Sequence, residues 1–303
     1  MHLRVFSSLS SSERRQFVDR YLSFLRDRDG ALDRVGRRLS KRDQLLAELA
    51  AHPVRRSGPR VVEQCVYDKN AVEQRTADPD LDPWTLWAVC LSKGSRMEEY
   101  AVRFLEETGR SKPGLADDPY TFIDFEERYH SRLLESLLQI VDIQPRWRPP
   151  GLLSRLTLRA IVAMPKAIAN ITVLCGELIG VATFKLFLET GRKLCADQPQ
   201  ARERLEFLMK QILIDELGHV LFLRSQLGPI RLSLARALLP IISRVLIADL
   251  PEARRLFGRR RLLDEISNPL LLQEVLDDVE AMPLLAQCAA VGSDMTREGL
   301  PQA

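Results

Sequence analysis

Residues 172–184 read TVLCGELIGVATF and place a single carboxylate, Glu177, in the middle of an apolar segment. The surrounding apolar run extends from Ala167 to Phe184, and the next basic residue along the chain is Lys185. Its length is borderline for a membrane span, and the polar Asn170 and Glu177 near its middle favour a buried core helix instead. Because burying an ionised carboxylate without a partner is strongly unfavourable, Glu177 needs a cation beside it.

The whole composition is that of a folded protein. Of the 303 residues, 46% are hydrophobic and 28% are charged, which allows one large domain or two ordinary ones. The net charge of +3 gives no sign of nucleic-acid binding, and the N-terminus lacks the apolar run of a secretory signal. We therefore expect a cytoplasmic protein whose five scattered cysteines, without any Cys-x-x-Cys pair, are reduced thiols: Cys65, Cys90, Cys175, Cys195 and Cys288.

Apolar residues recur at helical spacing along nearly the whole chain, and strand-like alternation is absent. The sequence thus predicts an all-α fold with four long helices between residues 83 and 227. We expect helical segments in 1–80 to pack on a core at 81–228. Shorter helices in 229–303 would belong to the same domain.

Two of the four histidines follow a glutamate by three residues, in Glu127-Arg-Tyr-His130 and Glu216-Leu-Gly-His219. On a helix, positions three apart lie one turn apart on the same face. Each pair also interrupts a stripe of apolar residues that would face a helical core. The stripes are Ile123, Glu127, His130, Leu134, Leu137 and Val141 in one helix, and Leu205, Met209, Ile212, Glu216, His219 and Leu223 in the other.

The first long helix offers one more acid at a core position. Its apolar side includes Trp84, Trp87 and Leu91, and Glu98 falls inside that stripe. Glu99 points about 100° away from it and stays open as the alternative. No basic residue lies on either Glu/His stripe, so a metal is a better partner for these acids than an arginine or a lysine.

The order of these groups resembles that of the ferritin-like di-iron carboxylate family. Bundles of that family take a glutamate from each of two helices and a Glu-x-x-His from each of the other two. The resemblance covers about residues 84–227 and implies a four-helix bundle core with flanking helices. It implies these metal ligands: Glu98 (or Glu99), Glu127, His130, Glu177, Glu216 and His219.

The resemblance also implies roles within the site. Glu127 and Glu216 would bridge the two metal ions. The acids before them, Glu126 and Asp215, would hold the far ring nitrogens of the histidines, with Asp215 on His130 and Glu126 on His219. No catalytic residue beyond the ligands is predicted.

The activity implied by the resemblance is that of a non-haem di-iron oxidoreductase, an oxidase or oxygenase, that uses O₂ on a small organic or acyl substrate. Two iron ions, or a mixed iron–manganese pair, would be the cofactor. No flavin, nicotinamide or iron–sulfur motif is present, so electrons would come from an external reductase.

Several branches of the family stay open. Leu134 stands where the ribonucleotide reductase small subunit has its radical tyrosine, which argues against that branch. Ile212 replaces the extra histidine of the arylamine N-oxygenases, so only a six-ligand N-oxygenase fits. Storage ferritins are much shorter. An acyl-carrier desaturase shares the six ligands, and the basic cluster at 252–261 is either a docking site for an acyl carrier protein or a solvated helix face.

Outside these branches, the alternatives are an Fe(II)-oxidising iron-handling protein and a non-catalytic helical binding protein. A homodimer is compatible with the sequence, and we expect neither a nucleic-acid partner nor a membrane span.

Overall fold

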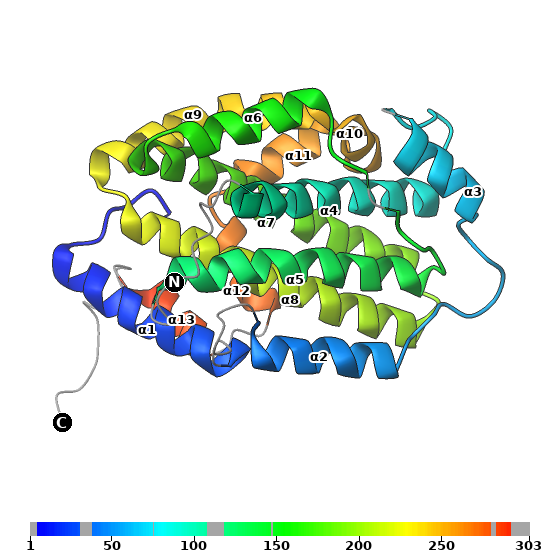
Figure 1. The fold of residues 1–303 in the computed structure, drawn as a ribbon, viewed down its shortest axis with the longest axis horizontal. Coiled ribbons are helices and arrows are strands. Elements are labelled where there is room, and N and C mark those ends of the chain that lie inside the picture. The colour runs from blue at the N-terminus through cyan, green and yellow to red at the C-terminus, as the bar shows by residue number, and fades with distance from the viewer. Residues whose placement is uncertain are drawn as a thin grey trace.

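The computed structural model describes residues 5–30, 38–74, 76–107, 118–146, 148–279 and 283–291, apart from the side chains at a few helical positions that include Glu98. Within these ranges the chain is helical and forms no β-strand, so the predicted all-α class is confirmed (Figure 1).

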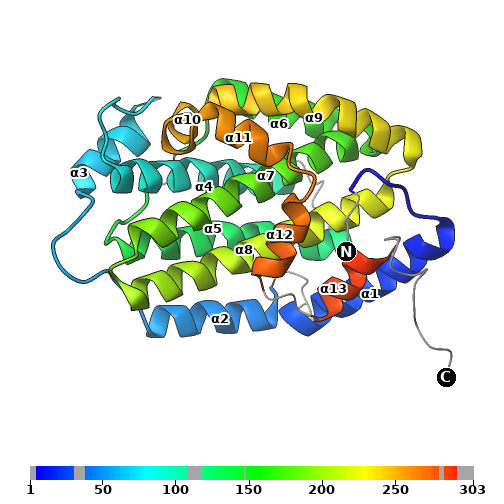
Figure 2. The ribbon, with the colours of Figure 1, turned by 180° about the vertical axis from the view of Figure 1, so that it is seen from behind.

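Four long helices form two pairs, which matches the prediction of four long helices between residues 83 and 227. The helices α4 and α5 pack against each other and face the viewer in Figure 1, and α7 and α8 form the second pair, seen from behind in Figure 2. Contacts between α5 and α8 and between α4 and α7 join the two pairs. Their bounds are α4 Pro83–Glu107, α5 Pro119–Ile140, α7 Lys166–Leu194 and α8 Pro199–Gln226.

Local signals set the ends of α5. Pro119 occupies its first turn, and an Asp118 side-chain oxygen accepts a hydrogen bond from the Tyr120 backbone N–H at 3.1 Å. After Ile140 the chain leaves the helix through Asp142, which adopts a left-handed conformation with a φ of 59°. The side chain of Asp142 accepts a hydrogen bond from Arg60 at 2.6 Å, which holds this turn in place.

The N-terminal segment covers one side of the four long helices. A capping box between Ser10 and Glu13 starts α1 (Ser11–Asp29). This helix packs on α5 and α8, and α2 (Ser40–Ala51) packs on α5. Further along, a short helical piece consisting of α3 (Gln64–Tyr67) and η1 (Asp68–Glu73) lies against α4.

The helices after α8 cover the remaining sides. A buried carboxylate ties this region to the first half of the chain, because Glu252 accepts hydrogen bonds from Lys93 Nζ at 2.6 Å and from the Ala77 N–H at 2.8 Å. The elements are α9 Pro229–Asp249, α10 Pro251–Phe257, α11 Arg259–Ile266, α12 Leu271–Asp278 and α13 Pro283–Ala290.

Two features differ from the sequence prediction. The stretch after the proline-rich residues 145–150 contains a helix, α6 (Leu152–Ala163), which the sequence reading left unassigned. The helix α9 continues for 21 residues through Pro240, although shorter helices were expected there. A proline removes one backbone hydrogen bond and bends a helix, but packing on α7 and α11 keeps α9 continuous.

The apolar segment that contains Glu177 forms most of α7. By length and composition, Ile168–Leu194 is long and apolar enough to cross a membrane, and its most apolar window has a mean hydropathy of 1.8. Of its most apolar window, 61% is buried inside the protein, where α7 packs mainly on α8 and α9.

Candidate metal centre

The two Glu/His pairs face each other across the contact between α5 and α8. His130 and His219 are completely buried, and their ring centroids lie 5.9 Å apart. The helical spacing predicted that each pair points inward, and the structure brings the two pairs together.

The outer nitrogen of each imidazole contacts a carboxylate on the opposite helix. His130 Nε2 lies 3.1 Å from Asp215 Oδ2, and His219 Nε2 lies 3.0 Å from Glu126 Oε2. These are the two contacts that the sequence reading expected. A carboxylate on Nε2 fixes the ring orientation and, in the neutral imidazole, draws the proton to that side, so that the lone pair of Nδ1 faces inward.

The inner nitrogens point into a group of carboxylates. His219 Nδ1 lies 3.2 Å from Glu127 Oε1 and 3.5 Å from Glu177 Oε2. His130 Nδ1 lies 3.4 Å from Glu216 Oε1 and 3.7 Å from Glu127 Oε2. Both Nδ1 atoms are buried, and neither forms a hydrogen bond among the described residues. Glu127 thus turns one oxygen toward each imidazole, which suits a bridging ligand.

The carboxylates converge closely enough to share a cation. Glu127, Glu177, Glu216 and His219 each offer one ligand atom, and these atoms lie within 4.8 Å of one another. Glu177 reaches this group from α7, so the acid in the middle of the apolar segment faces the cluster. We refer to Glu127, His130, Glu177, Glu216 and His219 as the cluster.

A glycine on α7 makes room for one of these carboxylates. A Cβ atom on Gly180 would lie 2.8 Å from Glu216 Oε2, which is closer than real Cβ atoms approach an oxygen. The absent side chain therefore lets Glu216 lie directly against the backbone of α7.

Two buried arginines from the N-terminal helices lie behind the cluster. Arg42 on α2 donates to Asp215 Oδ1 at 2.5 Å and to Asp29 Oδ1 at 2.6 Å, and it lies 3.5 Å from Glu126 Oε1. Arg28 on α1 also donates to Asp215, and to the Gln211 carbonyl oxygen at 2.8 Å. The arginines thus pair with the acids that hold the imidazoles, and neither forms an ion pair with a described cluster residue.

The sequence reading did not predict Arg28 and Arg42. A charged residue within an apolar stripe indicates a buried charge, and this pattern, which identified the Glu/His pairs, also applies to the two arginines. Arg28 continues the stripe of Phe17, Tyr21 and Phe24, all of which are buried. Arg42 follows the buried Leu39 by three residues, at core spacing.

The buried charges shift the pKa values of these groups strongly. Burial disfavours the carboxylate of Asp215, but the charges of Arg28 and Arg42 outweigh it and hold its pKa well below the usual range. Burial and the nearby Asp215 raise the pKa of Glu126 well above its ordinary value. Burial opposes a charged His219, yet contacts with Glu126, Glu127 and Glu177 raise its pKa well above that of a free imidazole.

The described part of the site carries more negative than positive charge. Two guanidiniums face six carboxylates, and neutral imidazoles would leave four negative charges. Such an excess inside a protein needs bound cations or protons. The six carboxylates belong to Asp29, Glu126, Glu127, Glu177, Asp215 and Glu216.

The sixth predicted ligand lies outside the described residues, because the side chain of Glu98 is one of those left out. Its alternative, Glu99, forms an ion pair with Arg103 one turn along α4, and its side chain is 26% exposed. Because its carboxylate is already paired with Arg103, Glu99 is less suitable as a metal ligand than its position in the sequence suggested.

The remaining predicted surfaces lie away from the cluster. In the basic cluster at 252–261, Arg261 pairs with Glu189 and Arg255 donates to the Ala77 carbonyl oxygen at 3.1 Å, so part of its charge is engaged within the chain.

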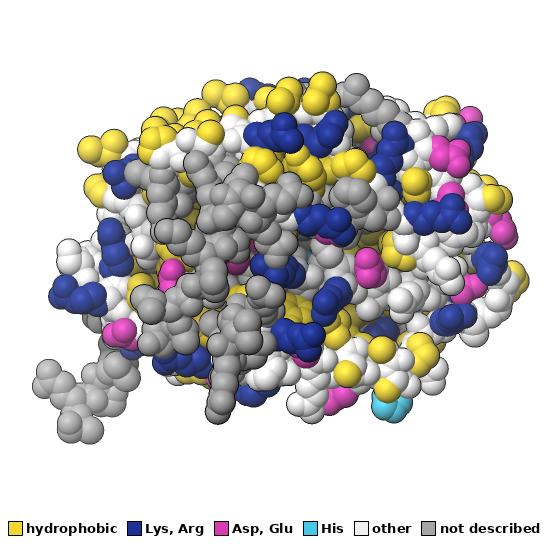
Figure 3. Space-filling view, viewed as in Figure 1, with side chains coloured by type: hydrophobic (Ala, Val, Ile, Leu, Met, Phe, Trp, Pro, Cys, Tyr) yellow, Lys and Arg dark blue, Asp and Glu magenta, His cyan; other side chains and the backbone are white. Residues whose placement is uncertain are grey.

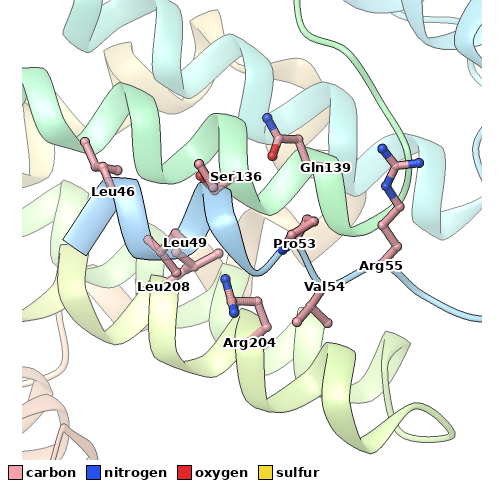
Figure 4. A pocket seen from close by; sticks show the side chains of 10 residues that line it. Leu46, Leu49, Pro53, Val54, Arg55, Ser136, Gln139, Arg204 and Leu208 are labelled. Atoms are coloured by element: carbon pink, nitrogen blue, oxygen red, sulfur yellow. The ribbon is translucent and has the colours of Figure 1, made fainter. Parts of the chain in front are cut away.

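A small pocket between α2, α5 and α8 is lined by Leu46, Leu49 and Leu208 with Gln139 and Arg204 (Figure 4). No cluster residue lines it.

The cluster has the donor atoms to hold a metal ion. It combines two imidazole nitrogens with three carboxylates, a mixed set that suits iron or manganese better than the closed tetrahedral sites of structural zinc. The Nδ1 atoms supply the most direct sign of fit, since both are buried and point at carboxylate oxygens 3.2–3.7 Å away, where one cation could bind nitrogen and oxygen together. Comparison of the chain with protein-family models, curated proteins and solved structures finds no match.

Proposed function

We propose that this protein is a non-haem di-iron oxidoreductase of ferritin-like architecture that uses O₂ to oxidise a small organic or acyl substrate. The observation that carries the proposal is the convergence of two buried imidazoles with three carboxylates, whose oxygens lie 3.2–3.7 Å from the Nδ1 atoms.

The contacts suggest how the ligands divide between two ions. Glu127 approaches both imidazoles and would bridge the ions. His219 and Glu177 would bind one ion, because they lie together on one side. His130 and Glu216 lie together on the other side, where Glu216 would bridge and the predicted ligand Glu98 would complete the set. Two divalent cations would balance the four negative charges of the described site.

A pair of iron ions held here would supply the electrons that reduce O₂, and an external reductase would restore them. The protein's own residues have simpler tasks. Asp215 and Glu126 keep the imidazole protons on Nε2, so that each Nδ1 stays available as a ligand. The apolar side chains around the cluster exclude water from it.

The side chains of the cluster differ in their exposure to solvent. Both imidazoles and the side chains of Asp215 and Glu126 are fully buried, while the side chains of Glu127 and Glu177 are 23% and 15% exposed. O₂ and substrate would reach the site from the side of these two glutamates. A substrate held there would lie against ligands rather than against Asp215, Arg28 and Arg42.

Oxygen consumption tests the proposal. Metal-free protein is loaded anaerobically with Fe(II), mixed with O₂ and compared with a Glu177→Gln variant, which keeps the shape of the ligand and removes its charge. Glu189→Gln, on the same helix but at the surface, is the matched control. We expect rapid O₂ consumption by the wild type and the control, and a loss of at least about tenfold in Glu177→Gln, as is typical when a metal site is perturbed.

The same assay separates the alternatives. With a chemical reductant present, an oxidoreductase consumes O₂ repeatedly only when its organic substrate is added. An iron-handling protein consumes O₂ in proportion to the Fe(II) supplied and needs no organic substrate. A wild-type protein that takes up no Fe(II) would contradict both functions and favour the non-catalytic binding protein.

A further inference from the structure

Large apolar side chains are exposed on one part of the molecule far more than elsewhere. Of the eleven that are exposed among the described residues, eight lie on α6, on the start of α7, directly between these two helices, or on α9. Exposed apolar residues scattered singly need no explanation, but a concentration of this kind marks an interaction surface. The eight are Leu152, Leu156, Met164, Ile168, Ile230, Leu234, Ile241 and Val245.

The helix α9 has two apolar faces. The inner face packs on the protein through Leu232, Ala235 and Ile247, which are buried. The outer face carries Ile230 at 83% exposure and Val245 at 56%, with Leu234 and Ile241 between them at helical spacing. A helix at a protein surface ordinarily has one apolar stripe, so the second stripe of α9 lacks a partner within the chain.

The same region is basic and contains almost no acids. Residues 143–176 and 228–248 include eight arginines or lysines and no aspartate or glutamate. On α9, Arg231, Arg236 and Arg244 are exposed, and no described carboxylate pairs with any of them. Arg159 is likewise exposed on α6.

The helices α6 and α9 lie along the same edge of the molecule. Both run along the upper edge in Figures 1 and 2, and both pack on α7. In Figure 3, apolar side chains gather along this edge with arginine or lysine side chains among them. We call the exposed side chains of α6, of the start of α7 and of α9 the upper face.

We propose that the upper face docks on the surface of a membrane that contains anionic lipids. Helices that lie in the plane of a bilayer surface combine an exposed apolar stripe with basic residues beside it, and both features are present here. Arginine side chains can extend from the apolar contact to the phosphate groups of the lipids.

Charge favours a membrane over a second copy of the chain. A dimer formed through two upper faces would bring arginines on one copy against arginines on the other, with no acid among the described side chains of either face to pair with them. A membrane rich in anionic lipids offers the opposite charge and an apolar interior at the same surface. The proposal concerns docking alone and does not depend on the metal or on the activity proposed above.

Vesicle sedimentation with the full chain tests the proposal. The probes are vesicles of phosphatidylcholine with about 30% phosphatidylglycerol, and vesicles of phosphatidylcholine alone. We expect the wild type to sediment with the anionic vesicles. The triple variant Arg231→Glu, Arg236→Glu and Arg244→Glu should bind about a hundredfold more weakly, because each basic residue near an anionic surface contributes roughly fivefold in affinity.

The apolar contribution has its own matched pair of variants. Ile230→Ser, Ile241→Ser and Val245→Ser together should lose binding, because they remove most of the outer stripe of α9. The control changes the three exposed apolar residues outside the upper face, Val66→Ser, Phe207→Ser and Leu270→Ser, and should bind like the wild type. All variants are at exposed positions, and circular dichroism with thermal unfolding checks that each is folded.

Three results would overturn the proposal. The first is a wild type that does not sediment with anionic vesicles, and the second is a control that loses as much binding as the α9 variants. The third is a wild type that is dimeric by analytical ultracentrifugation and becomes monomeric in the α9 variants without having bound vesicles, which would assign the face to a second copy.

Discussion

The contact between Gly180 and Glu216 allows a sharp test of the cluster, because α7 carries a matched control one turn away. A Cβ atom at Gly180 would meet Glu216 Oε2 at 2.8 Å, whereas a Cβ atom at Gly176 would meet nothing within 4 Å. Replacing either glycine by alanine favours the helix by about 0.8–1 kcal/mol. The two substitutions therefore have the same local effect on α7 and differ only at the cluster.

The size of the expected effect follows from the distance. Ordinary contacts of a Cβ atom begin at 3.4 Å, so Gly180→Ala requires the Glu216 carboxylate to move by about 0.6 Å, the difference between 3.4 and 2.8 Å. The carboxylate is the end of a flexible side chain and can move without unfolding the protein. A displaced ligand should weaken metal binding by about 10–100-fold, which corresponds to about 1.4–2.7 kcal/mol.

The assay has two parts. Urea unfolding of the metal-free proteins should show that Gly176→Ala and Gly180→Ala are both at least as stable as the wild type. Competition with a coloured chelator under anaerobic conditions then gives the affinity for Fe(II) or Mn(II). Gly176→Ala should match the wild type and Gly180→Ala should not. Equal affinities for all three proteins, each of them folded, would refute the assignment of Glu216 to a metal site.

Three further outcomes follow from the same contacts. Arg42→Met should lower the free energy of unfolding by about 3–5 kcal/mol, because it removes the arginine that pairs with the buried Asp29 and one of the two arginines on Asp215, and a loss below about 1 kcal/mol in urea unfolding would be inconsistent with this network. In metal-free protein the raised pKa of His219 means that its charged form adds stability below about pH 6.5, the pKa of an unfolded histidine. This stability is lost as the pH rises through the higher pKa of the folded protein. Thermal unfolding with a chelator from pH 6.5 upward tests this, and a stability that increases with pH would contradict it. Since a metal ion must displace that proton, the metal affinity should rise by about tenfold per pH unit below the folded pKa of His219, and calorimetric titrations that show no dependence on pH would exclude His219 as a ligand.

Helical spacing was sufficient to predict much of this molecule. The all-α class, the four long helices and the inward direction of His130 and His219 all follow from apolar residues that recur three or four positions apart. The contacts of Asp215 and Glu126 with the two imidazoles were predicted as well. Their prediction came from a resemblance in motif order, and the metal roles that this resemblance implies stay predictions.

Other features depend on tertiary structure and were missed. The two Glu/His stripes contain no basic residue, and Arg28 and Arg42 reach the site from helices near the N-terminus, far from both stripes in the sequence. The helix α6 follows a proline-rich segment, and α9 contains Pro240, so local signals argued against a long helix at both places. Packing on α7 outweighs those signals. The exposed apolar stripe of α9 can be identified only from the structure, which shows which face of this helix packs on the protein.

The metal content of the purified protein is the most direct test of the central claim. Elemental analysis should find about two iron ions, or one iron and one manganese, in each chain of the wild type and of a Glu189→Ala control. At most half of that amount should remain in Glu177→Ala and in His219→Ala, because each variant removes a ligand from the cluster. A folded wild type that stays free of metal after incubation with Fe(II) and Mn(II), or full occupancy in both variants, would contradict the account.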